Sequence, residues 1–214
     1  MKAAFFDMDG TLIDSRADLC ATVNHTRRDL GLSALPMDSI LRHVGLGAKH
    51  LLSNAIPEAA ADIENVWGMF MERYALHALE SVTLYPGVAQ TLERLSSAGW
   101  LLGINTAKPS SAVHAIIRKL DIERFFGDAV IAGGDCAEMK PSALPLLECA
   151  KKMGGHKVTG EDWMVGDNWT DLECAANAGV KSAFCTFGFG ILRDSKYTAK
   201  IDNFSELAEI MGSL

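Results

Sequence analysis

Residues 3–11, AAFFDMDGT, combine a short apolar run with two aspartates, Asp7 and Asp9, that are followed by Gly10 and Thr11. A continuously apolar run is typical of a strand that is buried on both faces of a parallel sheet. Open α/β sheets bind their ligands at the carboxyl ends of such strands. A purely structural turn is the plain alternative, but D-x-D-G-T arises by chance in only about a few of every thousand chains of this length. The segment therefore predicts a first strand that ends in a functional turn.

Further apolar runs of the same kind follow along the chain, at residues 100–104, 129–132, 163–165 and 182–185. Helical patterns separate most of them, with apolar stripes that begin at Val88, Val113 and Leu144. Residues 170–173 indicate a capping box that opens another helix, which Gly179 would end. Strands that alternate with helices predict an α/β fold with a Rossmann-like, doubly wound parallel sheet.

The stretch between Asp14 and Tyr85 breaks this alternation. It carries helical signals at residues 19–30, 40–44, 48–56 and 59–79, and no convincing strand. We therefore expect an all-helical insert directly after the first strand. The predicted organisation is a discontinuous core domain, residues 1–14 and 86–214, with a helical cap domain at residues 15–85.

The composition excludes several classes of protein. The chain has 214 residues, 49% of them hydrophobic, and a formal net charge of −7. A chain this acidic has no overall attraction for nucleic acid or an anionic membrane, and no apolar run approaches the ~18 residues that span a bilayer. The five cysteines form no C-x-x-C pair, and the six histidines show no zinc-ligand spacing. We expect a cytoplasmic protein with reduced thiols and no nucleic-acid or membrane partner.

Three more polar segments follow later strands. They are Thr106–Pro109, Lys140-Pro141 and Gly166–Asp171. Each one has an ordinary structural interpretation when taken alone, as a turn, a surface charge or a helix cap. Their order and their common position after successive strands instead favour one shared site.

These motifs resemble those of the haloacid dehalogenase-like superfamily, and within it the phosphoglycolate phosphatase-like branch. The matching residues are Asp7, Asp9, Gly10 and Thr11 in the first motif, Thr106 in the second, Lys140 in the third, and Gly166, Asp167 and Asp171 in the fourth. The insert after Asp14-Ser15 resembles the helical cap of these enzymes, and residues 44–49 resemble a cap segment of this branch.

The resemblance implies a phosphatase that works through an aspartyl-phosphate intermediate. Asp7 would be the nucleophile, and Asp9 would protonate the leaving group and later deprotonate water. Lys140 would offset the charge of the nucleophile, and Thr106 would donate its hydroxyl to the phosphate.

The same resemblance implies magnesium as the cofactor and a small phosphorylated metabolite as the partner. Mg²⁺ would be held by Asp7, the backbone carbonyl of Asp9, and Asp167, with Asp171 on the metal side. The expected substrate-binding residues are Gly10, Thr11, Ala107, Lys108, Arg42 and Lys49, with backbone N–H groups near Gly10 and Ala107 completing a phosphate cradle.

The chain departs from the family pattern at two positions. Ala107 stands where Asn commonly follows the second-motif Thr, which removes a side-chain amide from the phosphate side of the site. Ala143 stands where the family often has a second Pro after Lys140-Pro141. The first change bears on substrate orientation, and the second on a helix start.

Asp9 separates several reactions within the superfamily. Dehalogenases lack an acid at this position, and so do phosphonoacetaldehyde hydrolases, which use a cap lysine instead. Sugar-phosphate phosphatases and β-phosphoglucomutase-like phosphotransferases keep it and remain alternatives. A non-catalytic phosphoacceptor is an alternative from a different class, although such receivers need neither Asp9 nor a cap.

Basic side chains of the predicted cap cluster around Gly45 and Gly47. They are Arg42, His43, Lys49 and His50, and Arg16 at the start of the insert is a further basic side chain. A cation over the leaving group would suit a small carboxylate-bearing substrate, so 2-phosphoglycolate is the favoured substrate. Solvated charges on exposed helix faces are the alternative interpretation of these side chains. The sequence leaves open whether the protein is a monomer or a homodimer.

Overall fold

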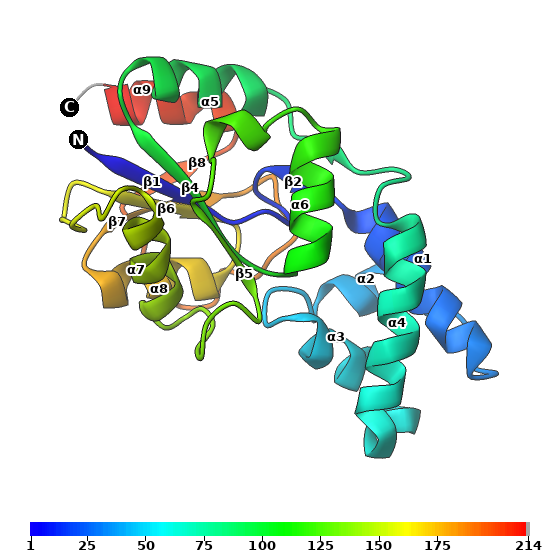
Figure 1. Cartoon of the computed structure of the whole chain (residues 1–214). Coiled ribbons are helices and arrows are strands. Elements are labelled where there is room, and N and C mark those ends of the chain that lie inside the picture. The colour runs from blue at the N-terminus through cyan, green and yellow to red at the C-terminus, as the bar shows by residue number, and fades with distance from the viewer. Residues whose placement is uncertain (213–214) are drawn as a thin grey trace.

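A computed structural model of the chain describes residues 1–212 and shows a six-stranded parallel sheet with helices on both faces (Figure 1). The strands are β1 (Ala3–Phe6), β2 (Ile13–Asp14), β3 (Thr83–Leu84), β4 (Leu101–Pro109), β5 (Val130–Gly133), β6 (Trp163–Gly166), β7 (Lys181–Cys185) and β8 (Ala199–Ile201). The strand order in the large sheet is β5-β4-β1-β6-β7-β8. The fold is thus the Rossmann-like α/β core that the sequence predicts.

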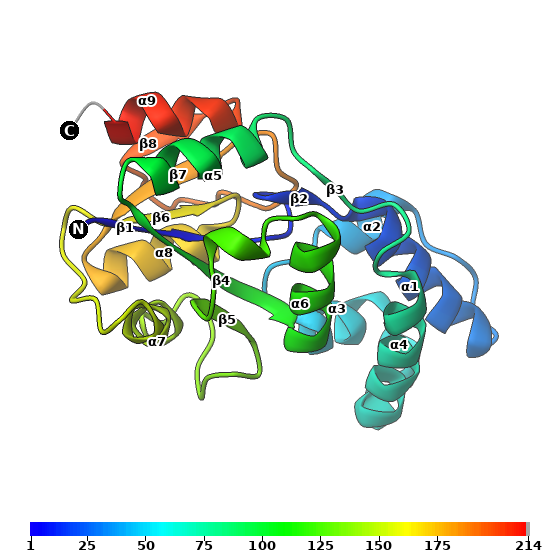
Figure 2. The same ribbon diagram turned by 45° about the horizontal axis from the view of Figure 1, so that its top comes forward.

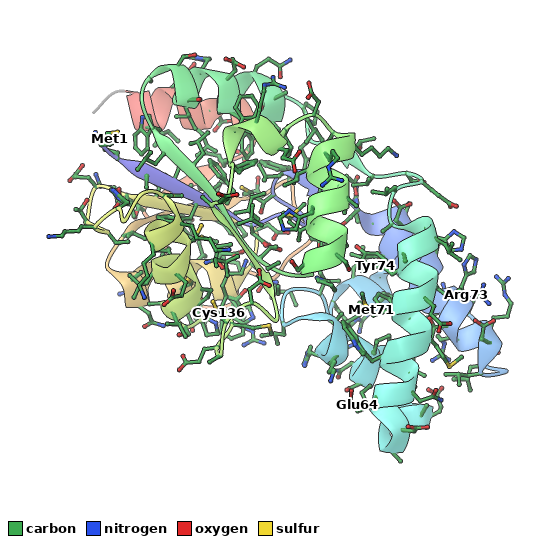
Figure 3. All side chains as sticks on the ribbon, in the orientation of Figure 1. Met1, Glu64, Met71, Arg73, Tyr74 and Cys136 are labelled. Atoms are coloured by element: carbon green, nitrogen blue, oxygen red, sulfur yellow. The ribbon has the colours of Figure 1, made fainter. Side chains whose placement is uncertain are left out.

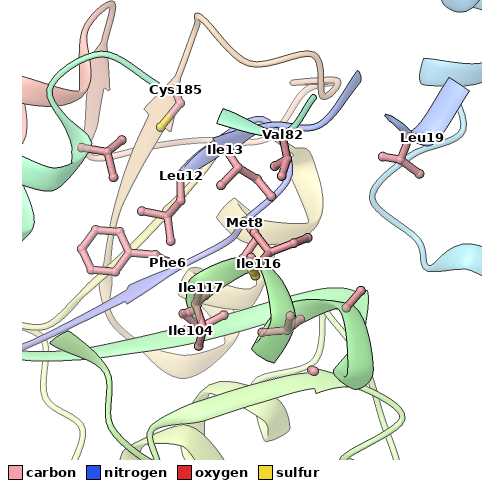
Figure 4. Close-up of a cluster of buried hydrophobic side chains, with 14 of the residues drawn as sticks. Phe6, Met8, Leu12, Ile13, Leu19, Val82, Ile104, Ile116, Ile117 and Cys185 are labelled. Carbon is pink, nitrogen blue, oxygen red and sulfur yellow. The ribbon is translucent and has the colours of Figure 1, made fainter. Parts of the chain in front are cut away.

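The helices between the later strands cover the two faces of this sheet (Figure 2). They are α5 (Val88–Ser97), α6 (Ser110–Lys119), α7 (Leu144–Lys152), α8 (Trp169–Ala178) and α9 (Leu207–Gly212), with short 3-10 turns at η2 (Glu123–Phe125) and η3 (Phe204–Glu206). Successive side chains of a strand point to opposite faces. Ala4 and Phe6 of β1 accordingly pack with α5, α6 and α9, whereas Ala3 and Phe5 pack with α7 and α8. Figure 4 shows Phe6 in the first of these clusters, together with Ile116 and Ile117 of α6.

The central position of β1 places the predicted functional turn in the middle of the sheet. β1 pairs in parallel with β4, where Phe6 lies opposite Ile104, and with β6, where Phe6 lies opposite Val165. All residues of β1 are buried, which explains its continuously apolar sequence. The carboxyl ends of β4, β1 and β6 therefore meet at one edge of the sheet.

The structure adds three strands that the sequence reading missed. β8 pairs with β7 at one edge of the sheet, and its three residues include the exposed Lys200, so no apolar run marks it. β2 and β3 form a small antiparallel pair, so the expectation of no strand between Asp14 and Tyr85 is wrong for β3. Two-residue strands are too short to carry a periodicity.

The segment between β2 and β3 is helical and extends away from the sheet (Figures 1 and 2). It contains α1 (Arg16–Asp29), α2 (Met37–Leu41), α3 (Ala48–Ala55), η1 (Pro57–Asp62) and α4 (Ile63–His77). The buried Asp18 carboxylate accepts backbone N–H bonds from Ser81 and Val82, which ties the start of α1 to the returning chain. No helix within residues 1–212 is long and apolar enough to cross a bilayer.

Candidate active site

The polar residues predicted from the strand ends lie together at the carboxyl edge of the sheet. Asp7 follows β1 directly, Thr106 lies near the end of β4, and Asp167 follows β6. The backbone N–H of Asp7 still donates to the carbonyl of Val165 at 3.0 Å, so the sheet holds this aspartate in place. All three side chains are buried or nearly so.

Lys140 lies between two of the carboxylates. Its Nζ is 2.9 Å from Asp7 Oδ1 and 2.6 Å from Asp171 Oδ1. Burial by itself lowers the pKa of this lysine, but the charges of Asp171 and Asp7 outweigh burial and hold its pKa above the usual range. Lys140 therefore stays a cation that compensates two buried acids.

Asp171 is held by the start of α8. Its Oδ2 accepts a hydrogen bond from the backbone N–H of Asn168 at 3.0 Å, which makes it the third helical residue of a capping box. The helix is capped by Asn168, so the expected capping box at residues 170–173 begins two residues too late; Gly179 ends the helix as expected. Burial raises the pKa of Asp171 to about 6, with the charge of Lys140 acting against that rise.

Asp167 lies in a tight backbone cage. Its Oδ2 accepts N–H bonds from Phe189 at 2.9 Å and Gly190 at 2.7 Å. A Cβ on Gly10 would lie 1.9 Å from Asp167 Oδ2, and one on Gly188 would lie 2.3 Å from the same atom. Only glycine fits these two positions, so Gly10 serves the packing of Asp167.

Asp7, Asp167 and Asp171 together form a site that fits a hard cation. Each offers a carboxylate oxygen, and these oxygens lie within 4.8 Å of one another. Burial raises the pKa of Asp167 well above its usual value, and the charges of Asp7 and Asp171 raise it further. Carboxylate oxygens are the ligands that Mg²⁺ and other hard cations prefer, and a cation would relieve this repulsion.

Asp9 has its own partners on the other side of the site. Its Oδ1 accepts from Ser15 Oγ at 2.5 Å and from Lys108 Nζ at 2.6 Å. The Lys108 side chain is only 1% exposed, and its Nζ lies over the ring of Tyr74 at 5.2 Å from the centroid. Burial lowers the pKa of Lys108, but Asp9 and Tyr74 outweigh it and raise this pKa above its usual range. Oδ1 of Asp9 is thus already occupied by two hydrogen-bond donors.

A cavity lies between the carboxyl edge of the sheet and the helical segment, and it encloses about 560 Å³ of space, part of it open to solvent. Its core side is lined by Asp7, Asp9, Thr106, Ala107, Lys108, Pro109, Asp167, Asn168, Phe189 and Gly190. Its other side is lined by Leu19, Val44, Gly45, Gly47, Ala48, Leu51, Phe70 and Tyr74. Thr106 Oγ1 accepts the backbone N–H of Lys108 at 3.3 Å, which leaves its own hydrogen available to a ligand.

The loop at residues 44–47 lies directly on the core. Asn168 Nδ2 donates to the carbonyl of Val44 at 3.3 Å. A Cβ on Gly45 would lie 2.5 Å from Asn168 Nδ2, and one on Gly47 would lie 2.9 Å from Met139 Cε. Both glycines also have positive φ values, 112° and 86°. They therefore allow the close approach that shapes the cavity.

Some predicted substrate-binding residues lie away from the cavity. The backbone N–H of Gly10 donates to the carbonyl of Ile13 at 3.0 Å, so it is not available for a phosphate cradle. Thr11 is fully buried outside the cavity lining. Arg42 is exposed and donates to the carbonyl of Asp38, and Lys49 is exposed and pairs with Glu64 at 2.6 Å. Ala107 and Lys108 do line the cavity, as expected.

Residues 4–185 match the model of the haloacid dehalogenase-like hydrolase family. The chain belongs to this family. The resemblance of the motifs to this family is thereby confirmed.

Proteins named phosphoglycolate phosphatase are among the relatives of this hydrolase. One from Agrobacterium fabrum is 35% identical over 193 residues, which cover 87% of this chain and 81% of the relative. One from Chromobacterium violaceum is 34% identical and covers 99% of this chain and 96% of the relative. The crystal structure of a predicted phosphoglycolate phosphatase from Haemophilus somnus superposes with a TM-score of 0.88 at 26% identity, covering 98% and 97% of the two chains.

Several residues of the site carry no clear signal in the sequence. Ser15 and Tyr74 reach Asp9 and Lys108 only because α1 and α4 pack as they do. The donors Phe189 and Gly190 lie 22 and 23 residues after Asp167. The Gly188-Phe189-Gly190 sequence is the one available hint, since closely spaced glycines often mark a close backbone approach.

Asp167→Asn should stabilise this hydrolase when metal is absent and the pH is neutral. The folded state raises the pKa of Asp167 above its ordinary value of 3.8, so it binds the proton more tightly than the unfolded state does. Stability therefore falls by about 1.4 kcal/mol per pH unit from about pH 4 up to the raised pKa, and Asn avoids this loss. Urea unfolding in chelator at pH 4 and pH 7 measures the effect.

The matched control is Asp128→Asn, which changes an exposed aspartate on the same domain. Adding Mg²⁺ should reverse the order, because the cation stabilises only a protein that retains the Asp167 carboxylate. A variant that is less stable than wild type at pH 7 in chelator would contradict the prediction.

Proposed function

We propose that this protein is a magnesium-dependent phosphatase that hydrolyses a small phosphate monoester, with 2-phosphoglycolate as the favoured substrate. The observation that carries the proposal is that Asp7 and Asp9 line the same cavity, with Lys140 and the Asp167 and Asp171 carboxylates around Asp7. The names of the relatives support the choice of substrate.

The nucleophile is Asp7. Its Oδ1 lies 2.9 Å from Lys140 Nζ, and its other carboxylate oxygen can attack phosphorus to form an aspartyl phosphate. Mg²⁺ would be held by Asp7, Asp167 and the carbonyl of Asp9, with the Asp171 carboxylate close by. When bound, the ion supplies charge neutralisation between an anionic nucleophile and an anionic phosphate. Thr106 donates its hydroxyl to a phosphate oxygen.

The general acid and base is Asp9. Its Oδ1 is occupied by Ser15 and Lys108, so the other oxygen is the one that meets the leaving-group oxygen and later the attacking water. The cap domain, residues 15–85, would cover this side of the site above the core of residues 1–14 and 86–214. Excluding water there strengthens each of these polar interactions.

The test is phosphate release from 2-phosphoglycolate and p-nitrophenyl phosphate, with Mg²⁺ and with excess chelator. We expect turnover with Mg²⁺ and none in chelator. A β-phosphoglucomutase-like phosphotransferase would instead convert a sugar phosphate into its isomer, and a pure phosphoacceptor would stop after one equivalent. Full activity in chelator would exclude the metal-dependent mechanism.

Asp9→Asn should separate substrates by their leaving groups. Alkoxides leave poorly without a proton, so we expect the kcat for alkyl phosphates such as 2-phosphoglycolate to fall about 10²-fold or more. p-Nitrophenolate hardly needs a proton, so its kcat should fall much less. Steady-state kinetics on both substrates measure the split, and equal losses on both would remove Asp9 as the acid.

A further inference from the structure

The wall of the cavity that faces the leaving group is almost entirely apolar. The helical segment contributes the side chains of Leu19, Val44, Ala48, Leu51, Phe70 and Tyr74 to the lining. Within residues 1–212, the Tyr74 hydroxyl is the one polar side-chain group that this segment brings to the lining. Tyr74 itself is 2% exposed, and its ring stacks on Phe70 with centroids 5.2 Å apart. This wall can thus match the shape of a leaving group but offers it very little hydrogen bonding.

The positive charge that lines the cavity comes from the core and not from the helical segment. Lys108 is the cationic side chain that lines it, among the residues that the structure describes. The basic side chains on the helical segment that were expected there, Arg42 and Lys49, bond to Asp38 and Glu64 on exposed surfaces. The cation that a ligand in this cavity meets therefore comes from β4, under the cover of Tyr74.

We propose that Lys108, together with the Tyr74 hydroxyl, selects leaving groups that carry one anionic group on the carbon next to the ester carbon–oxygen bond, and that the apolar wall rejects polyhydroxylated leaving groups. The proposal rests on the proposed phosphatase function and assigns its selectivity to two neighbouring residues of the cavity lining, with Lys108 Nζ over the Tyr74 ring.

The distances are consistent with this arrangement. Asp9 has to approach the ester oxygen to within about 2.6–3.2 Å to transfer a proton. Lys108 Nζ is 2.6 Å from Asp9 Oδ1, so it lies one hydrogen-bond length beyond the acid. In a two-carbon leaving group a carboxylate oxygen lies about 3 Å from the ester oxygen, given bond lengths of roughly 1.2–1.5 Å. A hydrogen bond from the Lys108 ammonium to that carboxylate oxygen spans the remaining distance.

The ammonium also has donors to spare. A lysine carries three N–H donors; one is directed at Asp9 Oδ1 and a second at the Tyr74 side chain, so a third remains for a ligand. Burial raises the pKa of Tyr74, so its hydroxyl remains a donor as well. A carboxylate placed here would receive charge-assisted hydrogen bonds beside two side chains that are themselves almost fully buried.

A sugar leaving group meets the opposite situation. Its hydroxyls would lose their water against Leu19, Leu51 and Phe70, which offer no hydrogen-bonding atom on their side chains. Each hydroxyl left without a partner lowers kcat/KM by roughly 10- to 100-fold. The wall thus acts against the sugar-phosphate alternatives that Asp9 alone leaves open.

The test compares 2-phosphoglycolate with ethyl phosphate, in which a methyl group replaces the carboxylate. Lys108→Met lowers both activities, because Lys108 also contacts Asp9, but this shared loss cancels in the ratio of the two kcat/KM values. We expect that ratio to fall about 10- to 100-fold in favour of ethyl phosphate. The matched control is Lys151→Met, which changes an exposed lysine paired with Glu148 on α7 and should leave the ratio unchanged.

Tyr74→Phe provides a second variant that keeps the ring and so should fold even if Lys108→Met does not. It should lower the same ratio about 3- to 10-fold, with circular dichroism as the check on folding. Wild-type enzyme should also turn over glucose 6-phosphate at least 100-fold less efficiently than 2-phosphoglycolate. The inference would be overturned if the ratio stayed unchanged in folded Lys108→Met, or in Tyr74→Phe where Lys108→Met does not fold. It would also be overturned if Lys49→Met lowered the ratio as much as these variants are expected to, or if glucose 6-phosphate were the better substrate.

Failure of the underlying function would look different. An enzyme that releases phosphate from neither 2-phosphoglycolate, ethyl phosphate nor p-nitrophenyl phosphate in Mg²⁺ would contradict the proposed function itself. Turnover of these substrates with an unaltered ratio in the variants contradicts only the role of Lys108 and Tyr74.

Discussion

Asp7→Asn is expected to abolish turnover, with a fall in kcat of at least about 10⁴-fold on every substrate. Asn has nearly the same shape as Asp but is a poor nucleophile, so no covalent intermediate can form. The fold should survive, because Lys140 keeps its partner Asp171 at 2.6 Å. Phosphate release and trapping of the phosphorylated enzyme by rapid acid quench measure the two parts of this expectation.

The control for this variant is again the exposed Asp128→Asn, which should retain full activity. The loss should be equally severe for p-nitrophenyl phosphate and for alkyl phosphates, because every substrate requires attack by Asp7 on phosphorus, whether or not its leaving group needs a proton. This pattern distinguishes Asp7 from Asp9. Substantial turnover by Asp7→Asn would remove the covalent mechanism.

Lys140→Met should damage both stability and activity. Met has a similar length and no charge, so Asp7 and Asp171 would lose the cation that lies 2.9 Å and 2.6 Å from them. Breaking a buried ion pair by removing one partner costs about 3–5 kcal/mol of unfolding free energy. We expect that loss in chelator at pH 7, by urea unfolding, and a fall in kcat of about 10³-fold in Mg²⁺.

Two controls separate charge compensation from general damage. Lys200→Met removes an exposed lysine that pairs with Asp202 at 3.5 Å and should change stability by less than about 1 kcal/mol. Mg²⁺ should restore part of the stability of Lys140→Met, since it supplies positive charge to the same carboxylates. A Lys140→Met protein as stable as wild type in chelator would show that Lys140 does not compensate this cluster.

The core and its acidic edge could be predicted because their signals are local. β1 is apolar because both of its faces are covered, and its central position follows from the parallel order of the strands. Parallel strands bring their carboxyl ends to one edge, which predicts that Asp7, Thr106 and Asp167 share that edge, and the order β4-β1-β6 makes them neighbours there. β8 escaped because a three-residue edge strand with an exposed lysine has no pattern to detect.

The capping of α8 shows a finer limit. The residues of the motif were identified, but the N-cap is Asn168 and not Thr170, which makes Asp171 both a residue of the capping box and a partner of Lys140. A helix cap contributes only about 0.5–2 kcal/mol to stability, so tertiary contacts decide between overlapping capping patterns in one segment. Here the capping box that includes Asp171 is the one formed, and Asp171 also makes the buried ion pair with Lys140.

The α/β core, the position of the helical insert, and the acids and the lysine around Asp7 could be predicted from local sequence, because each depends on a strand and the turn that follows it. What covers the cavity depends instead on how distant segments pack. Lys49 and Tyr74 both lie on amphipathic helices of the insert, and periodicity does not say which helix face meets a cavity and which meets water. Packing turned Tyr74 inward over Lys108 and left Lys49 outside with Glu64 (Figure 3 shows Tyr74 and Glu64 on α4). Contacts between segments far apart in the chain have no local signature, so the leaving-group side of this site could be known only from the folded molecule.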